Sequence, residues 1–380
     1  NRLFENWYAW KEAKLDNGHT AYMLGFVPLG EYHGASFTNL SKDGFVVGVT
    51  RGIYIMAEVA PNVCRVTRIQ TVDLKFSGIH KTLMDNAIDY LAKNELVEAN
   101  RLQEKFRRNG KEVDAEVRGA LVERMREGVE LEEDQKKVFG ELEELFGGED
   151  EEGWGPLKSP HEGVKMEIKY KQQEKGKKTL TFGRAECVAD CSAEEAAAWF
   201  FEYCSRERMA VDKEEGNLAR LEIQTYKGKP NEKVVATVKK LPKFIRNREF
   251  VNKLILRNDT HESISVAVWP LKDEVDYGGS AGTFVRGTTR AIFIANNIEN
   301  VIGVPQCKIE LLQHADAAGH LPKSLVDKKI PNTLSAVAEL RTSFNKDDEV
   351  DKAALASLAN IIKNEHQDYT DEEKDAIRNG

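Results

Sequence analysis

Arg248-Glu249-Phe250-Val251-Asn252 is the stretch that decides the fold, because it repeats Arg2-Leu3-Phe4-Glu5-Asn6 from the beginning of the chain. Further matches follow in the same order in both halves: Phe45, Val46, Gly48, Arg51 and Ile53 recur as Phe284, Val285, Gly287, Arg290 and Ile292, and Cys64, Gln70 and Asp73 recur as Cys307, Gln313 and Asp316. A period of roughly 240 residues is too long for a solenoid unit, so the repeated object is a whole domain. We expect the first copy to be only the C-terminal half of that domain, and to bind nothing by itself.

Composition narrows the class of protein. The 380 residues suffice for two or more domains at about 150 residues each, and 31% charged with 41% hydrophobic residues is typical of globular protein. A net charge of −8 argues against nucleic acid as a partner. Apolar runs stay well below the roughly 20 residues of a membrane span. We expect a cytoplasmic piece of a larger polypeptide.

The five cysteines, Cys64, Cys187, Cys191, Cys204 and Cys307, are scattered and odd in number. We expect reduced thiols rather than a disulfide framework. Cys187 and Cys191 lack the second ligand pair that a zinc site needs, so no metal and no cofactor are expected.

Alternating apolar residues predict antiparallel strands over 1–76 and again over 163–314, while helical spacing predicts a long helix over 81–106 and two charged helices near 113–126 and 131–146. Ser192, with Glu195 three residues later, predicts the start of a short helix, and Pro322 that of a long last one. The expected divisions are a truncated domain over 1–109, a charged helical linker over 110–153, a complete domain over 154–345 and a helical tail over 346–380. The fold class is α+β, with a curved antiparallel sheet wrapped around a long C-terminal helix.

Four stretches of the second unit carry a family resemblance: 180–195, Lys240–Val251, Phe284–Ala295 and Gln313–Val326. Together, in this order, they resemble the START (StAR-related lipid transfer) family. The resemblance implies the helix-grip fold, an internal cavity between sheet and C-terminal helix, and a lipid as cargo. Residues 1–109 are more weakly similar to the C-terminal half of the same domain.

Particular positions agree with or depart from the family pattern. Arg248 precedes a strand, so its guanidinium donors are expected on carbonyls or a carboxylate at the rim of the sheet. Gly319 is expected in a turn. Leu254 stands where several family members have a cavity arginine, and Met209-Ala210-Val211-Asp212 lies where a Trp-Asn pair is frequent. The cavity is therefore expected to be more apolar than usual.

The candidate ligand-binding residues are apolar positions of the strands and the last helix: Leu254, Val266, Val268, Phe284, Ile292, Ile294, Ile309, Leu311, Val326, Ile330, Leu334 and Val337. Each could equally be ordinary core. The loop over 270–282 could cover a tunnel mouth or be a plain hairpin connection. Its Gly278-Gly279-Ser280-Ala281-Gly282 has lipase-elbow spacing, but a strand follows where that motif needs a helix.

The leading interpretation is a non-catalytic lipid-binding or lipid-transfer module for a sterol or phospholipid, with transient membrane contact and neighbouring domains as further partners. One alternative is an interaction scaffold whose cavity has filled in. Another is a lipid-sensing regulatory domain of a larger protein. No nucleophile–base pair, phosphate loop or metal set is recognised in the sequence.

Overall fold

The computed structural model describes residues 2–14, 20–33, 44–60, 63–75, 99, 101–103, 105–106, 110–128, 130–147, 153–172, 179–223, 229–242, 245–271, 284–301, 303–319, 330–368, 370–371 and 375. The chain divides into two compact units. One comprises residues 1–120 with 227–230, and the other 121–226 with 231–380. The expected helix over 81–106 and the loop over 272–283, with its lipase-like glycines, fall almost wholly outside the described residues.

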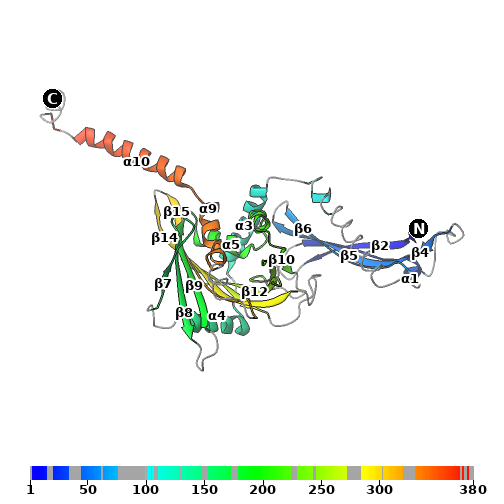
Figure 1. The fold of residues 1–380 in the computed structure, drawn as a ribbon. Coiled ribbons are helices and arrows are strands. Elements are labelled where there is room, and N and C mark those ends of the chain that lie inside the picture. Colours follow the sequence, from blue (N-terminus) through cyan, green and yellow to red (C-terminus); the bar gives the residue numbers. More distant parts are fainter. Residues whose placement is uncertain are drawn as a thin grey trace. The chain divides into compact units, whose positions relative to one another are not determined.

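The first unit is built on a four-stranded antiparallel sheet in the order β2-β3-β5-β6 (Figure 1). Its elements are β1 Arg2–Leu3, β2 Asn6–Lys14, β3 Thr20–Pro28, α1 Leu29–His33, β4 Val46–Val47, β5 Val49–Ala60 and β6 Val63–Asp73. The short strand β1 pairs in parallel with β4. The strands predicted from residue alternation are confirmed, whereas α1 was not expected.

The second unit contains a larger curved sheet in the order β10-β11-β12-β13-β14-β15-β9-β8-β7 (Figure 1). Its strands are β7 Gly155–Leu157, β8 Lys165–Gln172, β9 Thr179–Ala189, β10 Ala219–Ile223, β11 Glu232–Lys239, β12 Arg248–Asn258, β13 Ser263–Pro270, β14 Val285–Val301 and β15 Val304–Asp316. Successive strands pair antiparallel, and the first residues of β12 and β14 also pair in parallel. The α+β class with a curved antiparallel sheet is confirmed.

Local geometry recurs between the units at the repeated residues. Arg2 Nε donates to the Leu74 carbonyl at 2.5 Å, and Arg248 Nε donates to the Ala317 carbonyl at 2.6 Å. Two non-glycine residues at equivalent places, Lys75 and Ala318, have positive φ angles of 51° and 55°. Each donates its backbone N–H to the aspartate two residues earlier. These correspondences are independent of the sequence match, because the unusual backbone conformation was not part of it.

Helices pack against one face of the large sheet, over its central strands. α5 Ala193–Phe201 packs against β13 and β14, where the rings of Phe200 and Phe293 stack 4.4 Å apart. The predicted capping box is confirmed, because the Ser192 hydroxyl accepts from the Glu195 N–H and the Glu195 carboxylate accepts from the Ser192 N–H. α6 Arg206–Glu214 follows and was not expected.

The last helix of the grip differs from the expected continuous one. Its described part consists of α8 Ile330–Thr333 and α9 Ala336–Ser343, with Leu334 and Ser335 between them. Residues 320–329, where Pro322 was expected to begin the helix, lie outside the described residues. α9 packs against β9, β15 and α5.

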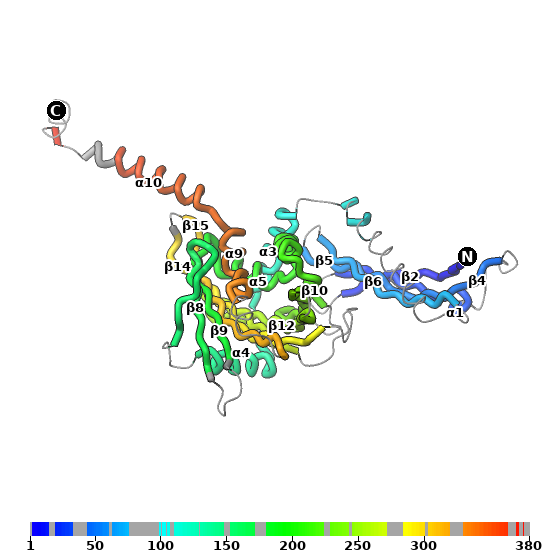
Figure 2. Tube along the Cα trace, viewed as in Figure 1, coloured from blue at the N-terminus to red at the C-terminus, as the bar shows by residue number. Residues whose placement is uncertain are grey.

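The two charged helices are confirmed as α3 Gly110–Glu127 and α4 Glu133–Phe146. Figure 2 shows α4 on the side of the sheet opposite α5 and α9. There Phe139 and Leu142 form a buried cluster with Ile255, Ala267 and Ile292. Much of the segment expected as a linker over 110–153 therefore belongs to the packed body of the second unit.

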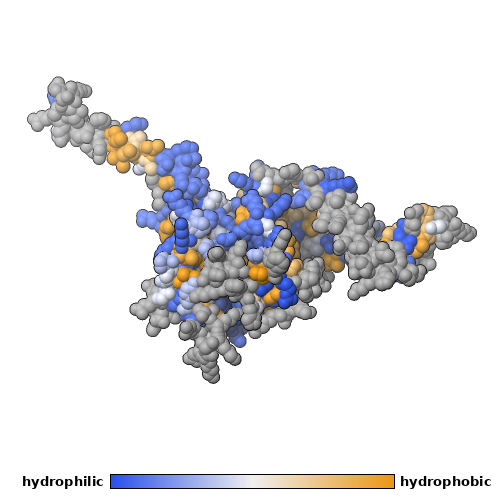
Figure 3. All heavy atoms as spheres, viewed as in Figure 1, coloured by the Kyte–Doolittle hydropathy of each residue, from blue (hydrophilic) through white to orange (hydrophobic). Residues whose placement is uncertain are grey.

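The tail over 346–380 contains α10 Asp347–Asp368. Its exposed apolar side chains give a patch on the helix surface (Figure 3): Leu355, Leu358, Ile361 and Ile362. Within the described part of the chain, every helix is too short or too polar to cross a bilayer.

Candidate functional site

A cavity of about 410 Å³ lies in the second unit between the sheet and the helices α6, α8 and α9. One row of paired residues crosses five strands along its floor: Leu254, Val268, Ala291, Gln313 and Gly183. Residues in register across neighbouring strands point to the same face of a sheet, so these positions form one continuous wall. Ile330, Asn332 and Ala336 line it from the helical side.

Gly183 sets the distance between this wall and the helices. A Cβ at this position would lie 3.0 Å from Leu334 Cδ1 and 3.3 Å from Ile330 Cγ2. The missing side chain lets the α8–α9 segment approach β9 closely. A side chain at this position would push Ile330 and Leu334 away from β9.

Four of the candidate ligand-binding residues line the cavity: Leu254, Val268, Leu311 and Ile330. Four more are buried outside its lining. Val266 and Ile309 lie further along the same strands, and Leu334 and Val337 lie in or next to α9. Phe284 precedes β14 and does not line the cavity, and Val326 lies outside the described residues.

Ile292 and Ile294 lie on the opposite face of the sheet. Both contact the cluster formed with α4. Their neighbours Ala291 and Phe293 face the α5 side, because side chains alternate between the faces along a strand. β14 carries apolar residues on both faces. An alternation of apolar and polar residues, which usually identifies the face that points inward, is therefore missing from this strand.

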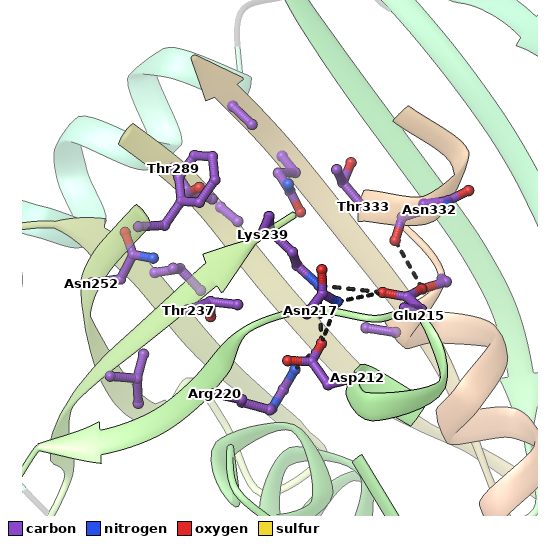
Figure 4. Close-up of a pocket in the computed structure, with 18 of the residues that line it drawn as sticks. Asp212, Glu215, Asn217, Arg220, Thr237, Lys239, Asn252, Thr289, Asn332 and Thr333 are labelled. Carbon is purple, nitrogen blue, oxygen red and sulfur yellow. Dashed lines mark hydrogen bonds and ion pairs between the residues drawn. The ribbon is translucent and has the colours of Figure 1, made fainter. Parts of the chain in front are cut away.

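One end of the cavity is polar (Figure 4). Asp212 of α6 and Arg220 of β10 form an ion pair at 3.6 Å, and each side chain is only 9% exposed. Lys239 Nζ and Asn217 Nδ2 each donate to Asp212 Oδ1 at 3.0 Å. Both also donate to Glu215, whose carboxylate is more exposed. This cluster was missed, because the sequence was expected to give a more apolar interior.

Aromatic rings surround the two arginines beside this end. The guanidinium of Arg220 lies 3.8 Å from the centre of the Tyr203 ring and donates from Nε to the Tyr203 carbonyl at 2.5 Å. Arg208 lies one helical turn before Asp212 and stacks over Trp199 at 4.6 Å. Burial, and secondarily the charge of Arg220, lowers the pKa of Arg208 to about 9. The i, i+4 spacing of Arg208 and Asp212 on one helix face was the only sequence signal for this site.

Arg248 is one of the residues that line the cavity, and it lies near the rim of the sheet. Its three nitrogens donate to the carbonyls of Ala317, Arg246 and Ala318, which confirms the expectation that carbonyls would satisfy the guanidinium. Gly319 has a φ of +72°, which confirms the expected turn. Arg248 therefore joins the start of β12 to the end of β15.

The thiols do not contribute to the cavity lining. Cys191 and Cys307 are buried with their sulfurs 3.6 Å apart in a weak S–H···S contact, and all five cysteines are free. Among the described residues, no group of three or more His, Cys, Asp or Glu side chains is arranged to hold a metal ion.

Comparisons with known proteins give structural matches only. No protein-family model and no curated protein matches the chain. Human StAR-related lipid transfer protein 5 is similar over 55% of this chain and 93% of its own, with 18% identity and a TM-score of 0.42. Human STARD10 is similar over 61% and 87%, with 18% identity and a TM-score of 0.41. The human StarD13 (DLC2) lipid transfer and protein localization domain is similar over 57% and 100%, with 14% identity and a TM-score of 0.40.

Proposed function

We propose that the second unit is a non-catalytic lipid-binding module that holds a hydrophobic ligand in the cavity between the sheet and α8–α9. The single observation that carries this proposal is the cavity itself. Its volume of about 410 Å³ falls within the range of small-molecule sites, and a row of residues with mostly apolar side chains forms its wall. Burial of apolar ligand surface, at about 25 cal/mol per Å², would supply the affinity.

The sequence repeat and the matching geometry at Arg2 and Arg248 support a tandem arrangement of two related units. In that arrangement the second unit, which contains the cavity, is the one that carries ligand. A cytoplasmic site of action and contact with a membrane surface during loading are part of the proposal.

Native mass spectrometry and lipid uptake from vesicles test this function. We expect the purified chain to carry a lipid-sized adduct, or to acquire one from phosphatidylcholine vesicles that contain a sterol. Ala291→Phe fills the cavity from its sheet wall and should lower uptake at least about tenfold, whereas Ile298→Phe, at an exposed position of the same strand, should not. Absence of both adduct and uptake would favour the interaction scaffold instead.

A further inference from the structure

The helix α10 is a second copy of α3. One constant shift in sequence relates Glu112-Val113-Asp114 near the start of α3 to Glu349-Val350-Asp351 near the start of α10. The structure adds a correspondence that the sequence match did not contain, because the same shift relates the first residues of the two helices, Gly110 and Asp347. The repeat therefore includes the helix that follows each copy of the sheet.

The apolar residues of the two helices also correspond, but their surroundings differ. The same shift pairs Leu121 with Leu358 and Met125 with Ile362, and in each helix the two residues lie one turn apart on one face. Leu121 and Met125 are 8% and 3% exposed, whereas Leu358 and Ile362 are 52% and 50% exposed. The face that is buried in α3 is thus exposed in α10 (Figure 3), and an exposed apolar patch of this kind marks an interaction surface.

The end of α3 and the helix α4 are attached to the large sheet of the second unit. Asn258 Nδ2, at the last residue of β12, donates to the Met125 carbonyl at 2.7 Å. Further along the chain, Phe139 of α4 packs into the apolar cluster on the sheet, and Arg257 Nη1 forms an ion pair with Glu143 at 2.9 Å. These contacts show how the helical segment between the two copies joins the sheet that follows it.

The sequence likeness continues beyond α10. After the insertion of one residue, Thr370–Ile377 aligns with Glu132–Phe139 at the start of α4, and each stretch begins with the spacing of a capping box. Ile377 takes the position of Phe139, the fully buried residue of α4. In sequence, the segment from α10 onward therefore repeats the pair of helices that is joined to the sheet of the second unit.

The charges of α10 argue against a lipid surface as the partner of its apolar face. The helix contains six acidic side chains and only two lysines. Helices that lie on membranes are typically rich in lysine and arginine on their polar face, because the lipid surface is anionic. The composition of α10 instead suits a protein surface.

We propose that α10 is a docking helix for another START-like unit, in which it takes the place that the end of α3 takes beside β12 of the second unit. Leu358 and Ile362 become buried there, as Leu121 and Met125 are in α3. The inference concerns how such units join one another, and it does not depend on the ligand of the cavity.

Two grafts test whether α10 fits this place, with the second unit of the full chain as the probe. In the first, residues 115–127 are replaced with the sequence of 352–364, which puts the side chains of Leu358 and Ile362 at positions 121 and 125. In the second, the same residues are replaced with the sequence of 353–365. This shift turns the apolar face by about 100° and puts those of Ala359 and Lys363 at positions 121 and 125. The second graft is the matched control, because its composition differs by one residue.

Thermal melting followed by circular dichroism gives the comparison. We expect the first graft to melt within about 6 °C of the unmodified chain, and the second to melt at least about 10 °C lower, because it buries a lysine and loses apolar packing. If both grafts are destabilised equally, the apolar face of α10 does not fit. If both melt like the unmodified chain, the end of α3 does not need an apolar face. Either result would overturn the inference.

Other occupants of the face are separate outcomes in the full chain. A variant with Leu358→Glu and Ile362→Glu removes the apolar face, and we expect it to match the unmodified chain in mass by sedimentation and in binding to vesicles of phosphatidylcholine and phosphatidylserine. A dimer that the variant dissociates would assign the face to a second copy of α10. Vesicle binding that the variant abolishes would assign it to a lipid surface. Both outcomes contradict the proposal, and neither bears on lipid uptake by the cavity.

Discussion

At the scale of single residues, a few polar side chains hold strands together through hydrogen bonds that the pattern of apolar residues does not predict. Arg248 is 5% exposed, and burial lowers its pKa, yet its donors all end on backbone carbonyls. Arg2 makes the equivalent contact in the first unit. In the second unit, the arginine therefore connects the start of β12 to the residues that follow β15.

Replacing Arg248 should weaken the second unit. Arg248→Met leaves its carbonyl partners without their charged donor, and we expect a loss of about 2 kcal/mol in the free energy of unfolding. Denaturant unfolding followed by circular dichroism measures the change. Arg246→Ala is the control, since Arg246 is exposed and its carbonyl is retained; it should change stability by less than about 0.5 kcal/mol. Similar values for both variants would contradict the role assigned to Arg248.

The cysteines should differ in reactivity according to burial. Burial raises the pKa of the Cys187 thiol to about 12 and that of Cys204 to about 11, so neither forms the reactive thiolate near pH 8. Cys64 is exposed, whereas Cys191 and Cys307 are buried. A disulfide reagent should therefore modify Cys64 rapidly and the others only after unfolding. Cys64→Ser should remove the fast reaction, and a fast phase that survives this change would contradict the prediction.

At the scale of elements, α4 shows how a charged helix can belong to a core. Most of its residues are exposed, but Phe139 and Leu142 are 1% and 0% exposed against the sheet. Gln135 at its first turn also donates to Asn231 at 3.3 Å. The two buried side chains, together with the partly buried Val138 and Phe146, hold the helix against the sheet.

Truncation of Phe139 tests this packing. Phe139→Ala removes a fully buried ring from the cluster with Ile255 and Ala267, and we expect it to cost about 3–5 kcal/mol of stability. Glu144→Ala, at an exposed position of the same helix, should be nearly neutral. If the unfolding midpoints of the two variants coincide, α4 is a spacer as its composition indicated.

Most strands could be predicted from the sequence because residue alternation and turn residues define them locally. The large sheet agrees with the expectation to within a few residues at β9, β11 and β15. Helix packing could not be predicted, because the position of α4 depends on Ile255 and Ile292, which lie far away in sequence. The polar end of the cavity was missed because the interior was expected to be apolar. Asp212 and Arg220 are close in sequence, and they meet where α6 is followed by β10.

At the scale of the whole molecule, the sequence repeat and the packed units have different boundaries. The repeat suggested that the complete domain begins near residue 154, whereas the second compact unit begins at residue 121 and includes α4. The face of the sheet opposite α5 is apolar at Ile255, Ala267 and Ile292, and α4 packs against these residues. The functional module should therefore extend further toward the N-terminus than the family resemblance alone suggests.

Fragments with different starting points test this boundary. A fragment over 110–380 keeps α3 and α4 and should fold and retain the lipid uptake of the full chain, whereas a fragment over 154–380 exposes the apolar cluster and should melt at a lower temperature or aggregate. A fragment over 110–346 lacks α10, whose apolar side chains are exposed, and should melt close to the 110–380 fragment. Thermal melts and vesicle uptake for all three give the comparison. If the fragments with and without residues 110–153 are equally stable, these residues are a linker, and the module begins near residue 154 as the sequence indicated.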